Sequence, residues 1–333
     1  MKGIAMTARA FRPPPAPDNR EGASRRVGVE LEFAGIAPAD AARAVAAVLE
    51  ATPRETGPGA WEVDGPGGTW EIYRDSALRK TERGRMLVDL AASVIPVEAV
   101  APPLPLAELP RVEAAATALR EAGASGTHDG ALLGLGMHLN VEARSTEARD
   151  LVPVLRAYAL IEDSLRAADP IDLARRALPF VDPFPSAFAT AAAAGADWDF
   201  AAMADAYLDH NPTRNRGLDV LPILKLVDAA RVEAALGSEI KIGARPAWHY
   251  RLPDCRIDEP DWSVAREWGR WLLVEEVADR PRLLEALAAA RLEFDDQLLA
   301  LPGEWRKRSD AILEDAGLSP AARMAEGSPE EAA

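Results

Sequence analysis

The sequence predicts a mixed fold of the α/β or α+β class, because segments with a strand pattern recur between segments with a helical pattern. Residues 27–33 (VGVELEF) alternate apolar and polar side chains, which is the period of two that a half-buried strand shows. Further strand-like segments follow at 70–76, 96–103, 134–142 and 245–253. The intervening segments predict helices.

Helical spacing or alanine-rich composition predicts helices over residues 37–51, 106–122, 149–168, 187–196, 200–208, 218–235, 262–278 and 282–301. Pro38 lies near the start of its helix and Gly123 follows the end of another, as helix boundaries favour. Glycine and proline predict irregular chain over 55–68 and 169–186. The apolar segment 86–95 fits a strand or a buried helix equally well. The three tryptophans at 262, 268 and 271 have helical spacing and predict a core face.

Composition limits the classes of partner. The chain has 333 residues, of which 48% are hydrophobic, enough for one large core or two modest ones. A formal net charge of -15 argues against nucleic acid or an anionic membrane as the main partner. One cysteine, no apolar run long enough to span a bilayer and no signal peptide fit a cytoplasmic protein.

We expect a disordered leader over residues 1–24, one catalytic domain over 25–315 and a disordered tail over 316–333. Residues 149–235 form a helix-rich insertion in this scheme. Length alone would also allow two domains.

Glu30 and Glu32 lie on the polar face of the strand at 27–33, as close neighbours that point the same way. Two like charges side by side repel, and a bound divalent cation would neutralise them. Carboxylates are the ligands that hard cations prefer. A solvated face of an edge strand is the alternative for an isolated pair of this kind.

Other strand segments also carry chemically useful side chains opposite their apolar stripes: Glu98, His138 with Asn140, and His249 with Arg251. A sheet that buries one face would gather these groups on the other. Carboxylates with one or two imidazoles suit magnesium or manganese, and arginine suits a phosphate or carboxylate. A single histidine of this kind is more often a hydrogen-bonded core residue, but the whole set favours a site.

Four motifs together resemble the amidoligase family of the carboxylate–amine ligase superfamily, which includes glutamine synthetase and glutamate–cysteine ligase. Residues 27–33 are similar to the family's G-x-E-x-E-F strand, and residues 70–76 to its W…D-x-S segment. Residues 97–103 are similar to its E-x-V-S-P-P strand end, and residues 137–141 to its H-[VIL]-[NH]-V strand. Their order and approximate spacing over residues 26–141 also match.

The resemblance continues in a loop at 211–216 and in Arg251, which fits the arginine of the family's last E-F-R strand. Two positions depart from the pattern. His249 stands where that strand has a metal-binding glutamate, and Ala101 replaces the serine of the third motif. Histidine can bind a metal but brings no negative charge, so this departure bears on the number of metals and on activity.

The resemblance implies an α+β fold like that of glutamine synthetase, with a curved, mostly antiparallel sheet lining a cleft and helices on its other face. It implies ATP and Mg²⁺ (or Mn²⁺) as cofactors. The implied reaction joins a small-molecule or peptide carboxylate to an amine through an acyl phosphate. The implied metal ligands are Glu30, Glu32, Glu98, His138 and His249. The implied nucleotide contacts are Arg214, Arg216, Asn140 and Arg251, and the implied catalytic residues are Arg251, Glu30 and His249.

Alternatives stay open from the sequence alone. Arg214 and Arg216 could be solvated loop residues. The chain could be a nucleotide- or metal-binding protein of the same fold that has lost its chemistry at His249, or a metal-dependent hydrolase built from the same side chains. A homo-oligomer is also open, since ligases of the glutamine synthetase type form rings.

Overall fold

The computed structural model describes residues 11–74, 96–127, 134–176, 181–297 and 303–326. The strands of this part of the chain form one eight-stranded antiparallel sheet in the order β2-β3-β4-β5-β1-β6-β8-β7. They are β1 (Arg26–Phe33), β2 (Pro53–Gly57), β3 (Ala60–Gly65), β4 (Gly68–Arg74), β5 (Val97–Pro105), β6 (Met137–Glu142), β7 (Leu218–Asp219) and β8 (Ala247–Tyr250). The fold is therefore a mixed α+β fold with an antiparallel sheet.

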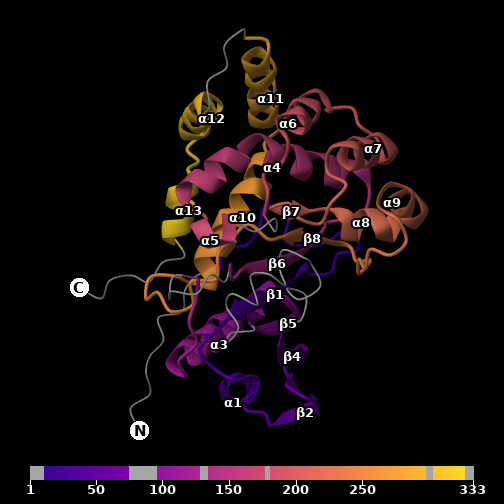
Figure 1. Ribbon diagram of the computed structural model, residues 1–333. Helices are drawn as coiled ribbons and strands as arrows, with labels where there is room; N and C mark the ends of the chain where they lie inside the picture. The colour runs from indigo at the N-terminus through magenta and orange to yellow at the C-terminus, as the bar shows by residue number, and fades with distance from the viewer. Residues whose placement is uncertain (1–10, 75–95, 128–133, 177–180, 298–302, 327–333) are drawn as a thin grey trace.

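The helices lie around this sheet, with α4, α6, α7 and α11 gathered beyond its β7 end and α1 beside β2 and β4 (Figure 1). The helices up to the middle of the chain are α1 (Pro38–Leu49), the short 3₁₀ helix η2 (Leu106–Glu108), α3 (Leu109–Glu121), α4 (Ala148–Ala168), α5 (Leu173–Arg176), α6 (Ser186–Ala194) and α7 (Phe200–His210). The later helices are α8 (Leu221–Val227), α9 (Ala229–Leu236), α10 (Val264–Ala278), α11 (Pro281–Asp295), α12 (Glu304–Asp315) and α13 (Pro320–Glu326). No helix in the described ranges combines the length and the apolar character that crossing a bilayer requires.

Strand β1 is the centre of the sheet and confirms the strand predicted at 27–33. It pairs with β5 on one side and with β6 on the other. Val27, Val29, Leu31 and Phe33 are buried on one face, whereas Glu30 and Glu32 point to the opposite face and keep partial exposure. Alternate residues of this sequence thus lie on opposite faces of the sheet.

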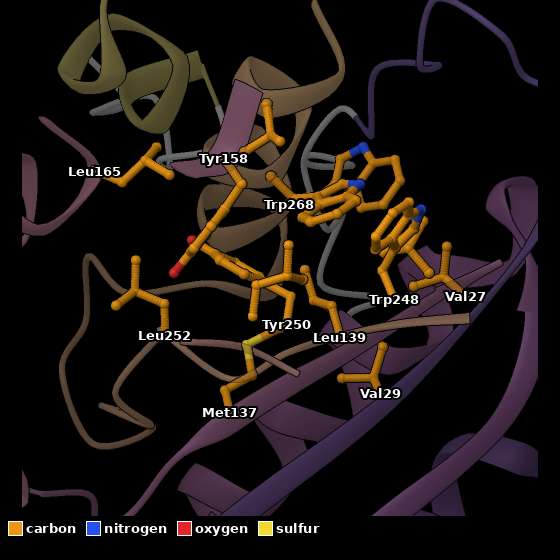
Figure 2. Packing of buried hydrophobic residues seen from close by; sticks show 14 of the residues in the cluster. Val27, Val29, Met137, Leu139, Tyr158, Leu165, Trp248, Tyr250, Leu252 and Trp268 are labelled. Atoms are coloured by element: carbon orange, nitrogen blue, oxygen red, sulfur yellow. The ribbon is translucent and has the colours of Figure 1, made fainter. Parts of the chain in front are cut away.

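The apolar face of the sheet packs on helices. Val29, Met137 and Leu139 point from their strands toward Tyr158 of α4 and Trp268 of α10 (Figure 2). Trp262, Trp268 and Trp271 are all buried, which confirms that this tryptophan set is core. Helix α3 covers β1 and β5, and α1 covers β3 and β4. Burying this face leaves the polar face to carry the site.

The predicted helices over 37–51, 149–168, 187–196 and 262–278 are confirmed as α1, α4, α6 and α10, with shifts of a few residues at their ends. Residues 106–122 begin with η2 before α3 starts. The strand at 96–103 does not stop at its prolines, because β5 extends to Pro105. Pro102 and Pro103 are tolerated because they fall beyond Val100, where the paired register with β4 stops, and at the point where β5 shifts its register against β1.

Three predictions differ from the structure. The irregular connection predicted over 55–68 is instead the hairpin β2–β3, in which Gly57 pairs with Ala60 and Gly59 turns with a φ of 73°. Residues 218–235 do not form one helix, but the short strand β7 and two helices, α8 and α9. Asp228 separates those helices, since its carboxylate caps α9 by accepting from the backbone N–H of Arg231. The irregular segment 169–186 also contains the short helix α5.

Both described chain ends contact the fold where the sequence predicted disorder. The indole N–H of Trp268 donates to the backbone carbonyl of Arg12 over 2.8 Å, and Arg25 donates to the carbonyl of Ala16 over 2.9 Å. Near the other end, residues 320–326 form α13, which packs on α10 with Met324 buried. The apolar segment at 86–95 lies outside the described residues.

Candidate functional site

The candidate site lies on the polar face of the sheet, where neighbouring strands place their functional side chains in register. Glu32 of β1 is the cross-strand partner of Glu98 of β5, and Glu30 is the partner of His138 of β6. His249 of β8 is the partner of Asn140 on one side and of Asp219 on the other. Because directly paired residues share a face, five strands deliver these groups to one surface.

Glu30 is the most connected carboxylate of the site. Its Oε2 lies 2.7 Å from Nδ1 of His138, and its Oε1 accepts a 2.7 Å hydrogen bond from the amide of Asn140. Burial alone raises the pKa of Glu30, but the hydrogen bonds from His138 and Asn140 and the influence of His249 hold that pKa well below its usual range. Glu30 is therefore an anion in the folded protein.

His249 is buried, with only 4% of its surface exposed, and faces Glu30 and His138. Its Nδ1 lies 3.4 Å from Oδ2 of Asp219, and its Nε2 lies 3.9 Å from Oε2 of Glu30. The rings of His138 and His249 meet edge to face, with centroids 5.2 Å apart. Burial lowers the pKa of His249 to about 4, so this imidazole is neutral near pH 7.

Glu32 and Glu98 form a carboxylate pair at the other end of the site. Oε2 of Glu32 accepts a 2.6 Å hydrogen bond from the backbone N–H of Gly136, and its Oε1 lies 3.8 Å from Nε2 of His138. Glu98 is 9% exposed. Cross-strand partners have Cβ atoms about 5 Å apart, which is close enough for both carboxylates to approach one ion.

Arg251 follows β8 directly and continues its alternation, so it lies on the same face as His249. Its backbone N–H donates to the carbonyl of Gly217, and its Nη1 donates to the carbonyl of Arg214 over 2.6 Å. Burial lowers the pKa of Arg251, and the nearby carboxylates of Asp219 and Glu32 act in the opposite direction. This guanidinium therefore lies within electrostatic reach of both ends of the site.

Arg214 and Arg216, the two arginines expected to contact a nucleotide, bond to neighbouring parts of the protein and so hold the loop at 211–216 in place. Arg214 donates to Oδ2 of Asp219 over 3.4 Å and to the carbonyl of Lys241 over 2.9 Å. Arg216 donates to the carbonyl of Pro183 over 2.7 Å. Arg214 therefore belongs to the edge of the site, whereas Arg216 turns toward the segment that precedes α6.

Three residues of this region were absent from the predicted site. Asp219 is fully buried against His249, and it was assigned to a predicted helix that is strand β7 in the structure. Arg245 donates to the side-chain oxygen of Asn140 over 2.5 Å. It stands four residues before His249, so the period of two in that strand was the available signal. Arg175 had no sequence signal, because it comes from a predicted irregular segment.

Arg175 holds the backbone of the segment that follows the last strand. Its guanidinium donates to the backbone carbonyls of Arg251, Leu252 and Pro253 over 2.5 to 2.8 Å, and it pairs with Asp254 over 3.1 Å. Close packing there requires Gly136, since a Cβ at this position would lie 2.6 Å from Nη2 of Arg175. Arg175 thereby fixes the backbone that carries Arg251.

The arrangement brings together most of the expected metal ligands. Among the described residues, Glu30, His138 and His249 form a group whose ligand atoms all lie within 4.8 Å of one another. Glu32 and Glu98 adjoin that group, Asn140 borders it through its hydrogen bond to Glu30, and Arg251 lies on the same face as His249. The donor set of carboxylates and imidazoles is one that divalent cations use.

The fold and the site define an α+β protein with a candidate metal site on the polar face of an antiparallel sheet. The chain belongs to the amidoligase family, because its residues 23–273 match the family described as "Putative amidoligase enzyme". This places it among ligase-type enzymes. The matched region begins before β1 and ends within α10, so it contains the whole candidate site. Comparisons with curated proteins and with solved structures gave no match.

Proposed function

We propose that this protein is an ATP- and Mg²⁺-dependent carboxylate–amine ligase that forms an amide bond through an acyl phosphate. The observation that supports this most is the convergence of Glu30, Glu32, Glu98, His138 and His249 on one sheet face, with Arg251 beside them. Such a combination suits phosphoryl transfer, where charge neutralisation and positioning provide nearly all of the catalysis.

The carboxylates fit Mg²⁺. This ion prefers oxygen ligands and is bound in phosphate-transferring sites by one or two carboxylates together with substrate phosphates. Glu32 and Glu98, with Glu30 beside Glu32 on the same strand, offer such oxygens at one end of the site. When bound there, Mg²⁺ would neutralise negative charge on the phosphates of ATP.

Arg251 would act on the transferring phosphoryl group. Its guanidinium carries a permanent positive charge and presents donors in a fixed fork, which matches phosphoryl oxygens. Its position is set by the carbonyl of Arg214 on one side and, through the backbone, by Arg175 on the other. Arg251 would thereby stabilise the charge that develops as a substrate carboxylate attacks the γ-phosphate.

The loop at 211–216 would border the nucleotide. Arg214 is held against Asp219, and Asn140 bridges Glu30 and Arg245. The chain shows no Walker-type P-loop sequence, so ATP would lie on the sheet rather than at a helix N-terminus. In this proposal the sheet and its cleft correspond to those of glutamine synthetase, and the cell compartment is the cytoplasm.

Calorimetry with ATP, with and without Mg²⁺, tests the first step. We expect ATP to bind only with a divalent cation, and phosphate to be released only when a carboxylate and an amine are both supplied. Absence of ATP binding in the presence of Mg²⁺ would refute the ligase proposal. Small-molecule and peptide carboxylates are the substrates to screen, each in combination with ammonium and with a primary amine.

Two alternatives have a structural argument. His249 in place of a glutamate reduces the negative charge of the site, which favours a binding protein without chemistry; ATP binding without phosphate release under any substrate pair would support it. Two imidazoles with one carboxylate is also a donor set of zinc hydrolases. Hydrolysis of an ester or amide without ATP would support that alternative.

A further inference from the structure

The Nε2 atom of His249 is a buried polar atom that has no hydrogen-bond partner among the described residues. The side chain is 4% exposed, and the nearest acidic oxygen, Oε2 of Glu30, lies 3.9 Å away, which is too far for a hydrogen bond. Leaving such an atom unpaired is unfavourable, because its hydrogen bond to water is lost on burial and nothing replaces it. A ligand at this position would satisfy it.

Asp219 determines which nitrogen of His249 is available. Its Oδ2 lies 3.4 Å from Nδ1 of His249, its Oδ1 accepts a 3.0 Å hydrogen bond from the N–H of Leu221, and Arg214 donates to Oδ2. A carboxylate held in this way favours the tautomer that carries its proton on Nδ1. The lone pair of Nε2 then faces Glu30 and His138.

This carboxylate–imidazole arrangement is the one that supports metal-bound histidines, in which the second ring nitrogen donates to an acidic oxygen. The donors of a tetrahedral site with bonds of about 2.1 Å stand roughly 3.4 Å apart. The separation of 3.9 Å between Nε2 of His249 and Oε2 of Glu30 needs only a small closure. On the side of His138, an ion would replace the proton now shared over 2.7 Å with Glu30.

We propose that the Asp219–His249 pair makes the Glu30–His138–His249 end of the site select a borderline divalent ion such as Zn²⁺ or Co²⁺ over Mg²⁺. Two imidazoles and one carboxylate suit these ions, whereas Mg²⁺ demands oxygen ligands in an octahedron. Asp219 acts here as a positioning residue. The inference rests on the proposed function and deepens it, since it assigns different ions to the imidazole end and to the Glu32–Glu98 end, with Glu30 between them as a carboxylate that serves both.

Cobalt spectroscopy on the full chain tests this proposal. After removal of metals with a chelator, Co²⁺ is titrated in and its visible absorption is recorded. We expect ligand-field bands of a four- or five-coordinate ion, which Zn²⁺ abolishes and a large excess of Mg²⁺ leaves in place. Absence of these bands, or their loss when Mg²⁺ is added, would overturn the proposal.

Variants of Asp219 and His249 test whether these two residues cause the preference for Co²⁺ over Mg²⁺. In His249→Glu the imidazole is lost, so Mg²⁺ should now displace Co²⁺. In Asp219→Asn the affinity for Co²⁺ should fall about 10- to 100-fold, as is typical when an outer-shell partner of a metal ligand is removed. His210→Gln is the control, because the Nδ1 of this histidine contacts the carbonyl of Ala206 on its own helix. Unchanged Co²⁺ affinity in Asp219→Asn would refute the role of Asp219.

Two measurements keep the outcomes separate. Thermal unfolding of each variant without metal shows whether the buried Asp219 is needed for folding; if Asp219→Asn does not fold, His249→Glu carries the test. Calorimetry of Mg²⁺–ATP on the same samples reports on the ligase proposal. Mg²⁺–ATP binding without the cobalt bands would refute this inference alone, and cobalt bands without ATP binding would refute the ligase proposal alone.

Discussion

Glu30 and His138 face each other across β1 and β6, with Oε2 of the carboxylate 2.7 Å from Nδ1 of the imidazole. Their register is set by the apolar partners on the opposite face, Val29 with Leu139 and Leu31 with Met137. A slip of β6 by one residue would turn His138 into the core and bring its apolar side chains to the polar face. The packing of the core therefore also fixes the geometry of the site.

Glu30→Gln should abolish Mg²⁺-dependent ATP binding. Glutamine keeps the shape and can still bond Asn140, but it removes the anion that a divalent cation requires. Loss of an outer-shell partner alone costs 10- to 100-fold in metal affinity, so loss of a ligand should cost about 100-fold or more. Calorimetry measures this. Glu55→Gln, at an exposed position of β2, is the matched control; equal affinity in the two variants would remove Glu30 from the metal site.

Arg251→Lys should slow phosphate release by about 10²- to 10³-fold, the typical cost of removing one donor from a developing anion. Lysine retains the charge but loses the fork that fits phosphoryl oxygens. ATP affinity should change much less than turnover. A coupled phosphate assay under saturating substrates provides the measurement, and Arg74→Lys, exposed on β4, provides the comparison. An equal loss in binding and turnover would assign Arg251 to ground-state binding instead.

Gly136→Ala should destabilise the protein by about 1–3 kcal/mol, the range for overpacking a tight site. The added Cβ would stand 2.6 Å from Nη2 of Arg175 and 3.1 Å from Nε2 of His138. Chemical denaturation measures the free energy of unfolding. Gly57→Ala is the control, since a Cβ there meets no atom of the described residues within 4 Å. If both substitutions cost the same, close packing at Gly136 is not the cause.

Arg175→Leu should cost about 3 kcal/mol of unfolding free energy, since buried Asp254 loses this ion pair and keeps only Arg256 at 3.4 Å and the N–H of Asp172, and three carbonyls lose the guanidinium donor. Phosphate release should fall as well, because the backbone at Arg251 loses its anchor. Arg175→Lys should recover part of the stability. Arg176→Leu, the exposed neighbour in α5, should change neither quantity; a similar loss there would contradict the anchoring role.

Glu267 predicts a pH dependence of stability that is unrelated to the site. Burial raises its pKa to about 7, against the opposing effect of Arg270, from the ordinary value of 4.5. The folded protein therefore retains a proton that the unfolded chain releases at lower pH. The contribution of this group to stability is full below pH 4.5 and is lost as the pH rises through about 7.

Glu267→Gln should remove this dependence, since glutamine is neutral throughout. The difference in unfolding free energy between the variant and the wild type should grow by roughly 3 kcal/mol from pH 4.5 to pH 8, following the change from 4.5 to about 7. Urea denaturation at several pH values provides the measurement. Glu293→Gln, exposed on α11, should run parallel to the wild type. A constant difference for Glu267→Gln would contradict the raised pKa.

The local pattern of the chain was sufficient to predict the strands that carry Glu30, Glu98, His138 and His249. A half-buried strand alternates its side chains, so the face of each residue can be inferred from its nearest neighbours. Helices α1, α4 and α10 were predictable for a similar reason, since helical spacing is also local.

The tertiary structure alone decided which groups meet. The β2–β3 hairpin was hidden by its turn-forming residues, and β7 is only two residues long, so neither has a pattern of its own. Asp219 reaches His249 because β7 pairs with β8, and Arg175 reaches the backbone of Arg251 because the fold places α5 next to the segment that follows β8. Such contacts join residues 30 to 80 positions apart, and strand pairing and close packing, rather than local sequence, determine them.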